Sequence, residues 1–233
     1  MLAAALLVTA LMGADPAPPL RVVTYNVGAL SLGAPGVVDT LRSLHADVIL
    51  LQEVDRNTHR SGTVDQPQLL GRALNMHVLF ARTMPHDGGD YGLAILSKTP
   101  LRKLRVHKLP RDGREEPRIV MAAVTTVRGQ DVTLLNTHLT ANWHSTNPDA
   151  SRLVQARALK EWGAGIKGAL ILGGDFNCVP GTPPLVLLDG HFTRAGPGAR
   201  LRPAFRGPPR RHRPRRSPTL PRRRLHRDVS NAP

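Results

Sequence analysis

Two apolar stretches that each end in polar residues, RVVTYNV (21–27) and DVILLQEV (47–54), decide the fold of this chain. Both are rich in valine, isoleucine and leucine over a length typical of buried strands. Between them, Val37, Leu41 and Leu44 recur at the spacing of one helix face. The segment therefore predicts a strand, a helix and a second strand at the start of an α/β domain.

Five more apolar segments, bounded by turn-forming residues, predict further strands: HVLFAR (77–82), GLAILS (92–97), RIVMAAVTTV (118–127), DVTLLNTHL (131–139) and ALILGGDFN (169–177). The stretch from Ser151 to Trp162 places Leu153, Ala156, Leu159 and Trp162 on one face, which predicts an amphipathic helix begun by Ser151. PLVLLDG (184–190) predicts a short helix. Six or seven strands with few helices favour a sandwich of two sheets over one doubly wound sheet.

The positive charge of the chain is concentrated near its C-terminus. The formal net charge is +15, yet residues 1–190 contain 19 Lys and Arg against 16 Asp and Glu, whereas residues 191–233 contain 13 Arg against the single acid Asp228. Aromatic residues make up 3% of the chain, which leaves little for stacking on bases. The nearly neutral body therefore does not favour DNA as the substrate.

The composition divides the 233 residues into three segments. Residues 1–19 carry an apolar run from Leu2 to Met12, too short to span a bilayer, and predict a signal peptide with a spacer. No Lys or Arg precedes this run, so a misassigned start or a buried helix is the alternative. We expect a secreted, extracellular protein, or otherwise a cytoplasmic one. Residues 20–190 predict one folded α/β domain.

The third segment, residues 191–233, is rich in Arg and Pro and has no strand or helix period. Such a segment buries too little apolar surface to offset the entropy of ordering it, so we expect a disordered basic tail. In one interpretation the tail is a basic arm that binds phosphate backbones or an anionic surface. In the other it is a stretch whose structure was not selected. The single cysteine, Cys178, excludes an internal disulfide and is interpreted as a small packing residue.

Polar side chains close several of the predicted strands and so reach sheet ends, where they can share one cleft. In chain order they are Asn26, Gln52, Glu53, Asn136, His138, Asp175 and Asn177. Glu53 and Asn26 offer the hard oxygen ligands that Mg²⁺ accepts. Asp175, if close to an imidazole, could orient it or a water for attack on phosphorus, and His138 and Asn177 can stabilise charge on phosphoryl oxygens.

Each of these residues also has a structural interpretation when taken alone. Glu53 could be a solvated loop residue, and His138 a histidine with satisfied hydrogen bonds in the core. Asp175 follows Gly173 and Gly174 and could simply form a turn. Their occurrence together and in order is what favours a catalytic site.

That order, TYNV, LQEV, GLAILSKTPL, NTHL and GDFN, resembles the endonuclease/exonuclease/phosphatase superfamily over about Arg21 to Leu188. The superfamily includes nucleases similar to deoxyribonuclease I and exonuclease III, neutral sphingomyelinases and inositol-polyphosphate 5-phosphatases. The resemblance implies an α/β fold, a four-layer sandwich of two mixed sheets flanked by helices. It also implies cleavage of a phosphoester by in-line attack of water, with Mg²⁺ as cofactor and Mn²⁺ as the alternative.

Carried over motif by motif, the resemblance implies a role for each site residue. Asn26 and Glu53 would serve the metal, and His138 would contact the scissile phosphate. Asp175 with Asn177 would position the nucleophile and stabilise the transition state. The expected function is hydrolysis of a phosphoester, a phosphodiester rather than a monoester, in nucleic acid, a phospholipid head group or a small molecule. We expect a monomer without a stable protein partner.

The C-terminal segment departs from the family pattern. Family members end with a strand similar to arginine-isoleucine-aspartate-tyrosine and then a serine-aspartate-histidine motif with a catalytic histidine. Residues 224–228, RLHRD, resemble these only faintly. We hypothesise that the coding sequence is frameshifted or mispredicted after about residue 190, so that the last strands are missing. The alternative function is then an inactive remnant whose basic tail binds nucleic acid non-specifically.

Overall fold

A computed structural model of the chain describes residues 20–31, 33–111, 115–142 and 146–193. All of these residues belong to one compact unit, Met1–Arg202. The predicted signal peptide and the predicted tail beyond Thr193 lie outside the described residues. Among the described helices, none combines the length and the apolar character needed to cross a membrane.

The first sheet has the strand order β1-β2-β4-β3. Its strands are β1 (Val22–Asn26), β2 (Val48–Arg56), β3 (His77–His86) and β4 (Gly89–Ser97), and its helices are α1 (Ala34–Ser43) and α2 (Gln66–Leu74). β1 and β2 are parallel and are connected by α1, as predicted, whereas β4 is antiparallel to β2 and β3. Helix α2 was not predicted; the Asp65 side chain caps it by accepting a hydrogen bond from Gln68 N.

The second sheet has the order β5-β6-β7-β8 and repeats the pairing pattern of the first. Its strands are β5 (Arg102–Lys108), β6 (Ile119–Val127), β7 (Gln130–His138) and β8 (Ala169–Asp175), with helices α3 (Pro148–Ala164) and α4 (Pro183–Asp189). β7 and β8 are parallel and are connected by α3, while β6 is antiparallel to both β5 and β7. Two short 3₁₀ turns, η1 (Gly28–Leu30) and η2 (His59–Ser61), follow β1 and β2. Each sheet thus ends in one parallel edge strand, β1 or β8.

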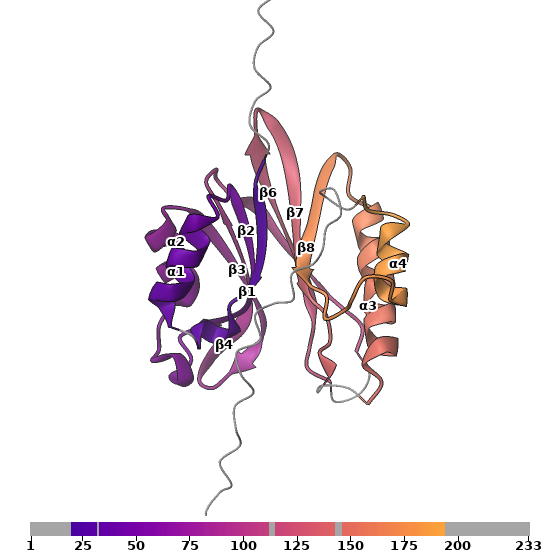
Figure 1. The fold of residues 1–233 in the computed structure, drawn as a ribbon, viewed down its shortest axis with the longest axis horizontal. Helices are drawn as coiled ribbons and strands as arrows, with labels where there is room; N and C mark the ends of the chain where they lie inside the picture. Colours follow the sequence, from indigo (N-terminus) through magenta and orange to yellow (C-terminus); the bar gives the residue numbers. More distant parts are fainter. Residues whose placement is uncertain (1–19, 32, 112–114, 143–145, 194–233) are drawn as a thin grey trace, which may run out of the picture. The chain divides into compact units, whose positions relative to one another are not determined.

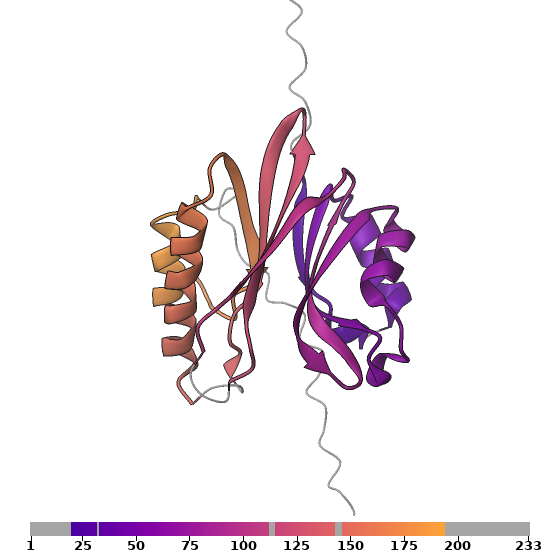
Figure 2. The same ribbon diagram turned by 180° about the vertical axis from the view of Figure 1, so that it is seen from behind.

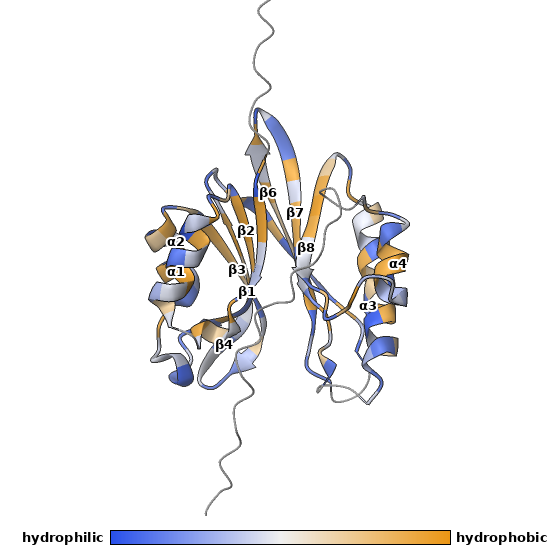
Figure 3. Cartoon of the chain, viewed as in Figure 1, coloured by the Kyte–Doolittle hydropathy of each residue, from blue (hydrophilic) through white to orange (hydrophobic). Residues whose placement is uncertain are grey.

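The two sheets pack face to face and the helices cover their outer faces, as Figures 1 and 2 show. Along β2 the side chains alternate between two clusters: Leu50 packs with Met121 and Leu134 between the sheets, whereas Ile49 and Leu51 pack toward α1 and α2. A third cluster lies between the second sheet and helices α3 and α4. Figure 3 shows the apolar residues concentrated on the strands. The predicted four-layer sandwich of two mixed sheets is confirmed.

Two expectations about individual elements were wrong. Strand β5, of sequence RKLRVHK, raises the number of described strands to eight. It has only two apolar residues, Leu104 and Val106, both exposed, so its apolar signal is weak, and hydrogen bonds to β6 hold it in the sheet. Helix α3 begins at Pro148 rather than Ser151, because the Asn147 side chain accepts a hydrogen bond from Ala150 N.

The buried face of α3 also differs from the predicted one. Ala156 and Leu159 are buried as expected, but Arg152 and Gln155 are buried with them at 5% and 0% exposure. Two polar side chains that a hydropathy pattern assigns to solvent therefore point into the protein. Both side chains bind the loop that follows β7.

Candidate active site

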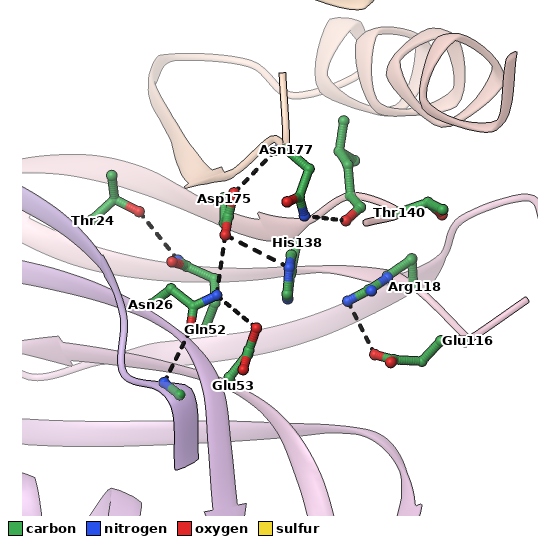
Figure 4. Close-up of polar contacts among 12 residues, drawn as sticks. Thr24, Asn26, Gln52, Glu53, Glu116, Arg118, His138, Thr140, Asp175 and Asn177 are labelled. Carbon is green, nitrogen blue, oxygen red and sulfur yellow. Dashed lines mark hydrogen bonds and ion pairs between the residues drawn. The ribbon is translucent and has the colours of Figure 1, made fainter. Parts of the chain in front are cut away.

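The carboxyl ends of three strands bring the predicted site residues together. Asn26 ends β1, His138 ends β7 and Asp175 ends β8. The Asn26 side-chain nitrogen Nδ2 donates to Glu53 Oε1 at 2.8 Å and to Asp175 Oδ2 at 3.1 Å (Figure 4). Asn26 and Asp175, which lie 149 positions apart in the chain, are thus in direct contact.

Glu53 reaches this site because β2 is irregular at that point. The pairing of β2 with β4 runs through Leu51↔Ala94 and resumes at Val54↔Gly92, so a β-bulge lies between. Glu53 has a φ of 56°, in the left-handed region that costs a non-glycine residue about 1–3 kcal/mol. In a regular strand, the period of two would place Glu53 on the same face as Leu51, toward the helices. The bulge turns its carboxylate toward Asp175 instead.

Asp175 connects the imidazole to the loop that follows β8. His138 Nε2 lies 3.7 Å from Asp175 Oδ2, and Asp175 Oδ1 accepts a hydrogen bond from Asn177 N at 3.0 Å. Asn177 Nδ2 donates to Leu139 O at 2.9 Å. A side-chain amide has two N–H donors, so this bond leaves Asn177 one further N–H for an anion.

A buried arginine that the sequence analysis did not single out lies beside His138 (Figure 4). The Arg118 side chain is 2% exposed and its Nη1 lies 3.1 Å from Glu116 Oε1. Its Nε is buried without a hydrogen-bond partner among the described residues. Arg118 immediately precedes the antiparallel strand β6, whose start lies beside the end of β7. A search confined to strand ends therefore misses it, whereas strand starts on antiparallel neighbours would have revealed it.

The electrostatics of the site favour a cation. Burial raises the pKa of the Glu53 carboxyl, and this is the largest effect on it. The hydrogen bond from Asn26 lowers the pKa by a smaller amount, so the net pKa is raised. The charges of Asp175 and Glu116 raise this pKa further, and that of Arg118 lowers it. Burial, and then the Glu53 charge, also raise the pKa of the Tyr91 phenol, which therefore stays protonated.

The donor set fits a hard divalent ion. Glu53 offers a carboxylate and Asn26 an amide oxygen, which is the small number of protein ligands that Mg²⁺ takes when it keeps several waters. An amide oxygen accepts two bonds, so Asn26 Oδ1, which accepts one from Gly28 N at 3.0 Å, can bind a cation as well. The described residues contain no cluster of three or more His, Cys, Asp and Glu side chains suited to a metal. An all-protein cage, as in structural zinc sites, is thus not formed by this part of the chain.

Helix α3 fixes the loop that follows His138. Gln155 Oε1 accepts a hydrogen bond from Thr140 N at 3.0 Å, and Gln155 Nε2 donates to Thr140 Oγ1 at 2.8 Å and to Pro110 O at 3.1 Å. Arg152 Nη1 donates to Thr140 O at 3.1 Å and to Asn142 Oδ1 at 2.8 Å. One buried amide therefore ties the end of β7 to the loop that leads toward Arg118.

All five residues predicted for the site lie in this one region. The structure brings together Asn26, Glu53, His138, Asp175 and Asn177 by the contacts described above. Gln52 and Asn136, which also close strands, are buried behind them at 1% and 0% exposure. Cys178 is half-buried, and burial raises the pKa of its thiol, which disfavours the reactive thiolate.

Solved structures of similar fold match about three quarters of this chain. An endonuclease/exonuclease/phosphatase from Beutenbergia cavernae matches with a TM-score of 0.55 and 23% identity over 71% of this chain and 50% of that one. TDP2 of D. rerio, solved with a single-strand DNA product, gives 0.54 and 21% over 75% and 66%. Sphingomyelinase C from Streptomyces griseocarneus gives 0.54 and 18% over 75% and 70%. The chain thus spans half the length of the Beutenbergia protein.

The sequence itself matches a family profile. No curated protein sequence matches the chain. The profile of the endonuclease/exonuclease/phosphatase family matches residues 23–225. Members of this family are phosphoester hydrolases that commonly use divalent metals. The chain belongs to the endonuclease/exonuclease/phosphatase family.

Proposed function

We propose that this protein is a metal-dependent hydrolase that cleaves phosphodiesters in preference to monoesters. The observation that carries the proposal is the Asn26 amide, which holds Glu53 of one sheet and Asp175 of the other at 2.8 and 3.1 Å. His138 lies 3.7 Å from Asp175 on the same side. Carboxylates, an amide and an imidazole so arranged are the groups that in-line attack of water on phosphorus requires.

Each side chain has one role in this proposal. Glu53 and Asn26 would hold Mg²⁺, with Mn²⁺ as a substitute, and the bound ion would neutralise charge on the phosphate. Asp175 accepts a proton from, or orients, the attacking water. His138 and the free N–H of Asn177 donate to the phosphoryl oxygens as negative charge grows there.

The charge balance supports a diester rather than a monoester. Glu53, Asp175 and Glu116 place three carboxylates near the site, whereas Arg118 is the buried cation beside His138, paired with Glu116. A phosphodiester carries one negative charge, and a monoester close to two at neutral pH. Repulsion by the carboxylates therefore disfavours the monoester more strongly.

The substrate class stays broad in this proposal. The structural neighbours include a protein solved with a DNA product and a sphingomyelinase. A nucleic acid, a phospholipid head group and a small phosphodiester all present the same scissile group. We further propose that the protein is secreted, which rests on the apolar run Leu2–Met12 of the sequence, and that it acts as a monomer.

Hydrolysis of bis(4-nitrophenyl) phosphate tests the proposal. We expect Mg²⁺-dependent release of nitrophenol, at least 100-fold lower in Glu53→Ala and Asp175→Ala. Glu161→Gln, which removes one exposed carboxylate from α3, is the matched control and should retain the wild-type rate. We expect 4-nitrophenyl phosphate, the monoester, to react more slowly. Turnover that survives EDTA, or that is equal in the variants and the control, would overturn the proposal.

A further inference from the structure

The candidate site is divided between two sheets, so something must hold its two halves in register. Glu53 belongs to β2 of the first sheet, whereas His138 and Asp175 belong to β7 and β8 of the second. A shift of one sheet across the other would separate the carboxylates without unfolding either. We propose that Asn136 is the positioning residue that sets the Glu53 half against the His138 half. The inference rests on the proposed function of this site.

Asn136 is placed on β7 to act across the sheets. It lies two residues before His138, and therefore on the same face of the strand. Its side chain crosses to the first sheet, where Nδ2 donates to Leu51 O at 2.8 Å and to Ala94 O at 2.9 Å. Asn136 is fully buried, at 0% exposure. The contact therefore fixes the second sheet to two backbone carbonyls of the first.

Those two carbonyls lie at the edge of the β2 bulge. Leu51 and Ala94 are the last paired residues before the register of β2 and β4 shifts, and the pairing resumes at Val54 and Gly92. Glu53 lies inside the shift with its left-handed backbone. Since the bulge turns the Glu53 carboxylate into the site, the group that binds both carbonyls at its edge also stabilises the orientation of Glu53.

The oxygen of the same amide is also used. Asn136 Oδ1 accepts a hydrogen bond from Gln52 Nε2 at 2.7 Å, and Gln52 is itself inside the bulge. Gln52 Nε2 further contacts Thr24 Oγ1 and Leu50 O, both at 3.1 Å. The Asn136 side chain thus uses both N–H donors and its oxygen for bonds to β2 and β4, and none for its own sheet. A residue that served only the stability of β7 would have no reason to bond in this way.

Thr137 provides a matched control on the same strand. It is equally buried, at 0% exposure, and its Oγ1 donates to Ile119 O at 2.9 Å, within the second sheet. Thr137→Val removes a buried hydrogen bond with almost no change of shape. Asn136→Leu removes the inter-sheet bonds and keeps the number and branching of the side-chain heavy atoms. The two variants therefore separate loss of a buried bond from loss of sheet registration.

The test uses the full chain and two measurements. Hydrogen exchange of the backbone at residues 48–56 reports on the bulge whether or not the protein is active. Calorimetric titration with Mn²⁺ reports on the site. In Asn136→Leu we expect at least fivefold faster exchange at residues 48–56 and at least fivefold weaker Mn²⁺ binding. In Thr137→Val we expect both values to stay within twofold of wild type. Asn136→Ser, which keeps one donor, replaces Asn136→Leu in both comparisons if the latter does not fold.

Several results would overturn the positioning role. Unchanged exchange in the Asn136 variant would refute the effect on the bulge. Faster exchange with unchanged Mn²⁺ affinity would show that the bulge does not set the site. Equal losses in Thr137→Val would show a general effect of buried bonds. If wild type itself binds no Mn²⁺ and cleaves no diester, the proposed function fails, and the exchange comparison alone decides the placement of the bulge.

Discussion

Replacing Glu53 by glutamine should have opposite effects on stability with and without a divalent cation. Glu53 Oε1 and Asp175 Oδ2 bind the same Asn26 nitrogen at 2.8 and 3.1 Å, so these two oxygens lie within about 6 Å of each other. At an effective dielectric constant of about 20, two such charges repel by about 3 kcal/mol. Glutamine keeps an oxygen for the Asn26 hydrogen bond and removes the repulsion. We expect Glu53→Gln to be more stable than wild type by about 1–3 kcal/mol in EDTA at neutral pH, after screening by salt.

The pH dependence of this difference follows from the raised pKa of Glu53. Burial, with a contribution from the Asp175 charge, raises the pKa in the folded protein above the ordinary value of 4.5. The folded state then binds the proton more tightly than the unfolded state does. The metal-free wild type therefore loses stability as the pH rises from 4.5 through the raised pKa, whereas Glu53→Gln does not. The two proteins should be equally stable at the acidic end of this range and differ most above it.

A divalent cation should reverse the order. At a Mn²⁺ concentration of about 100 times Kd, binding stabilises the wild type by about 2.7 kcal/mol. For a domain of this size that corresponds to a rise in Tm of about 5–11 °C. Glu53→Gln should gain much less because it has lost a carboxylate ligand.

Thermal unfolding of wild type, Glu53→Gln and the control Glu161→Gln, each in EDTA and in Mn²⁺ at several pH values, measures both effects. Glu161 is exposed on α3, so its variant should follow wild type throughout. The reasoning is refuted if Glu53→Gln shows the same Mn²⁺-dependent rise in Tm as wild type. It is also refuted if the stability difference in EDTA does not depend on pH.

Three further predictions concern the scaffold and the tail. Gly174→Ala should unfold at several degrees lower temperature, because a Cβ there would lie 2.2 Å from Thr137 O. Gly36→Ala, at a position of α1 where a Cβ meets no other atom, should instead be stabilised by about 0.5–1 kcal/mol in chemical denaturation. Gln155→Leu should destabilise the protein by about 1–3 kcal/mol and speed hydrogen exchange at residues 138–142, because the loop after β7 loses its bonds to Gln155. Leu159→Ala, from the same buried helix face, should lose similar stability without faster exchange in that loop. Equal exchange in both variants would show that Gln155 does not fix the loop. Deleting residues 191–233 should abolish any non-specific, salt-sensitive binding of nucleic acid in a titration over ionic strength, and retained binding would exclude the tail as its source.

The internal strands were predictable from the sequence because they are apolar on both faces. β2 and β4 contain the segments DVILLQEV and GLAILS, and almost every residue in them is buried. Strand β5 could not be predicted in this way, since most of its side chains are exposed and its place in the sheet depends on pairing with β6. The start of α3 was missed for a related reason: its cap is Asn147, a polar residue before a proline, and its buried face includes the polar Arg152 and Gln155.

The sequence by itself determined the chemistry that is available: an asparagine, a glutamate, a histidine and an aspartate-asparagine pair, each at the end of an apolar run. Local patterns are sufficient for this because the alternation of buried and polar side chains is a property of each strand alone. Only the tertiary structure decided that these groups meet. Asn26 and Asp175 lie 149 residues apart and are joined because β1 and β8 are the parallel edge strands of two packed sheets. The direction of Glu53 depends on a bulge that breaks the strand period, and the Asn136 side chain binds strands that are distant in sequence. No local pattern contains these contacts, since each depends on how strands pair within a sheet or on how one sheet lies on the other.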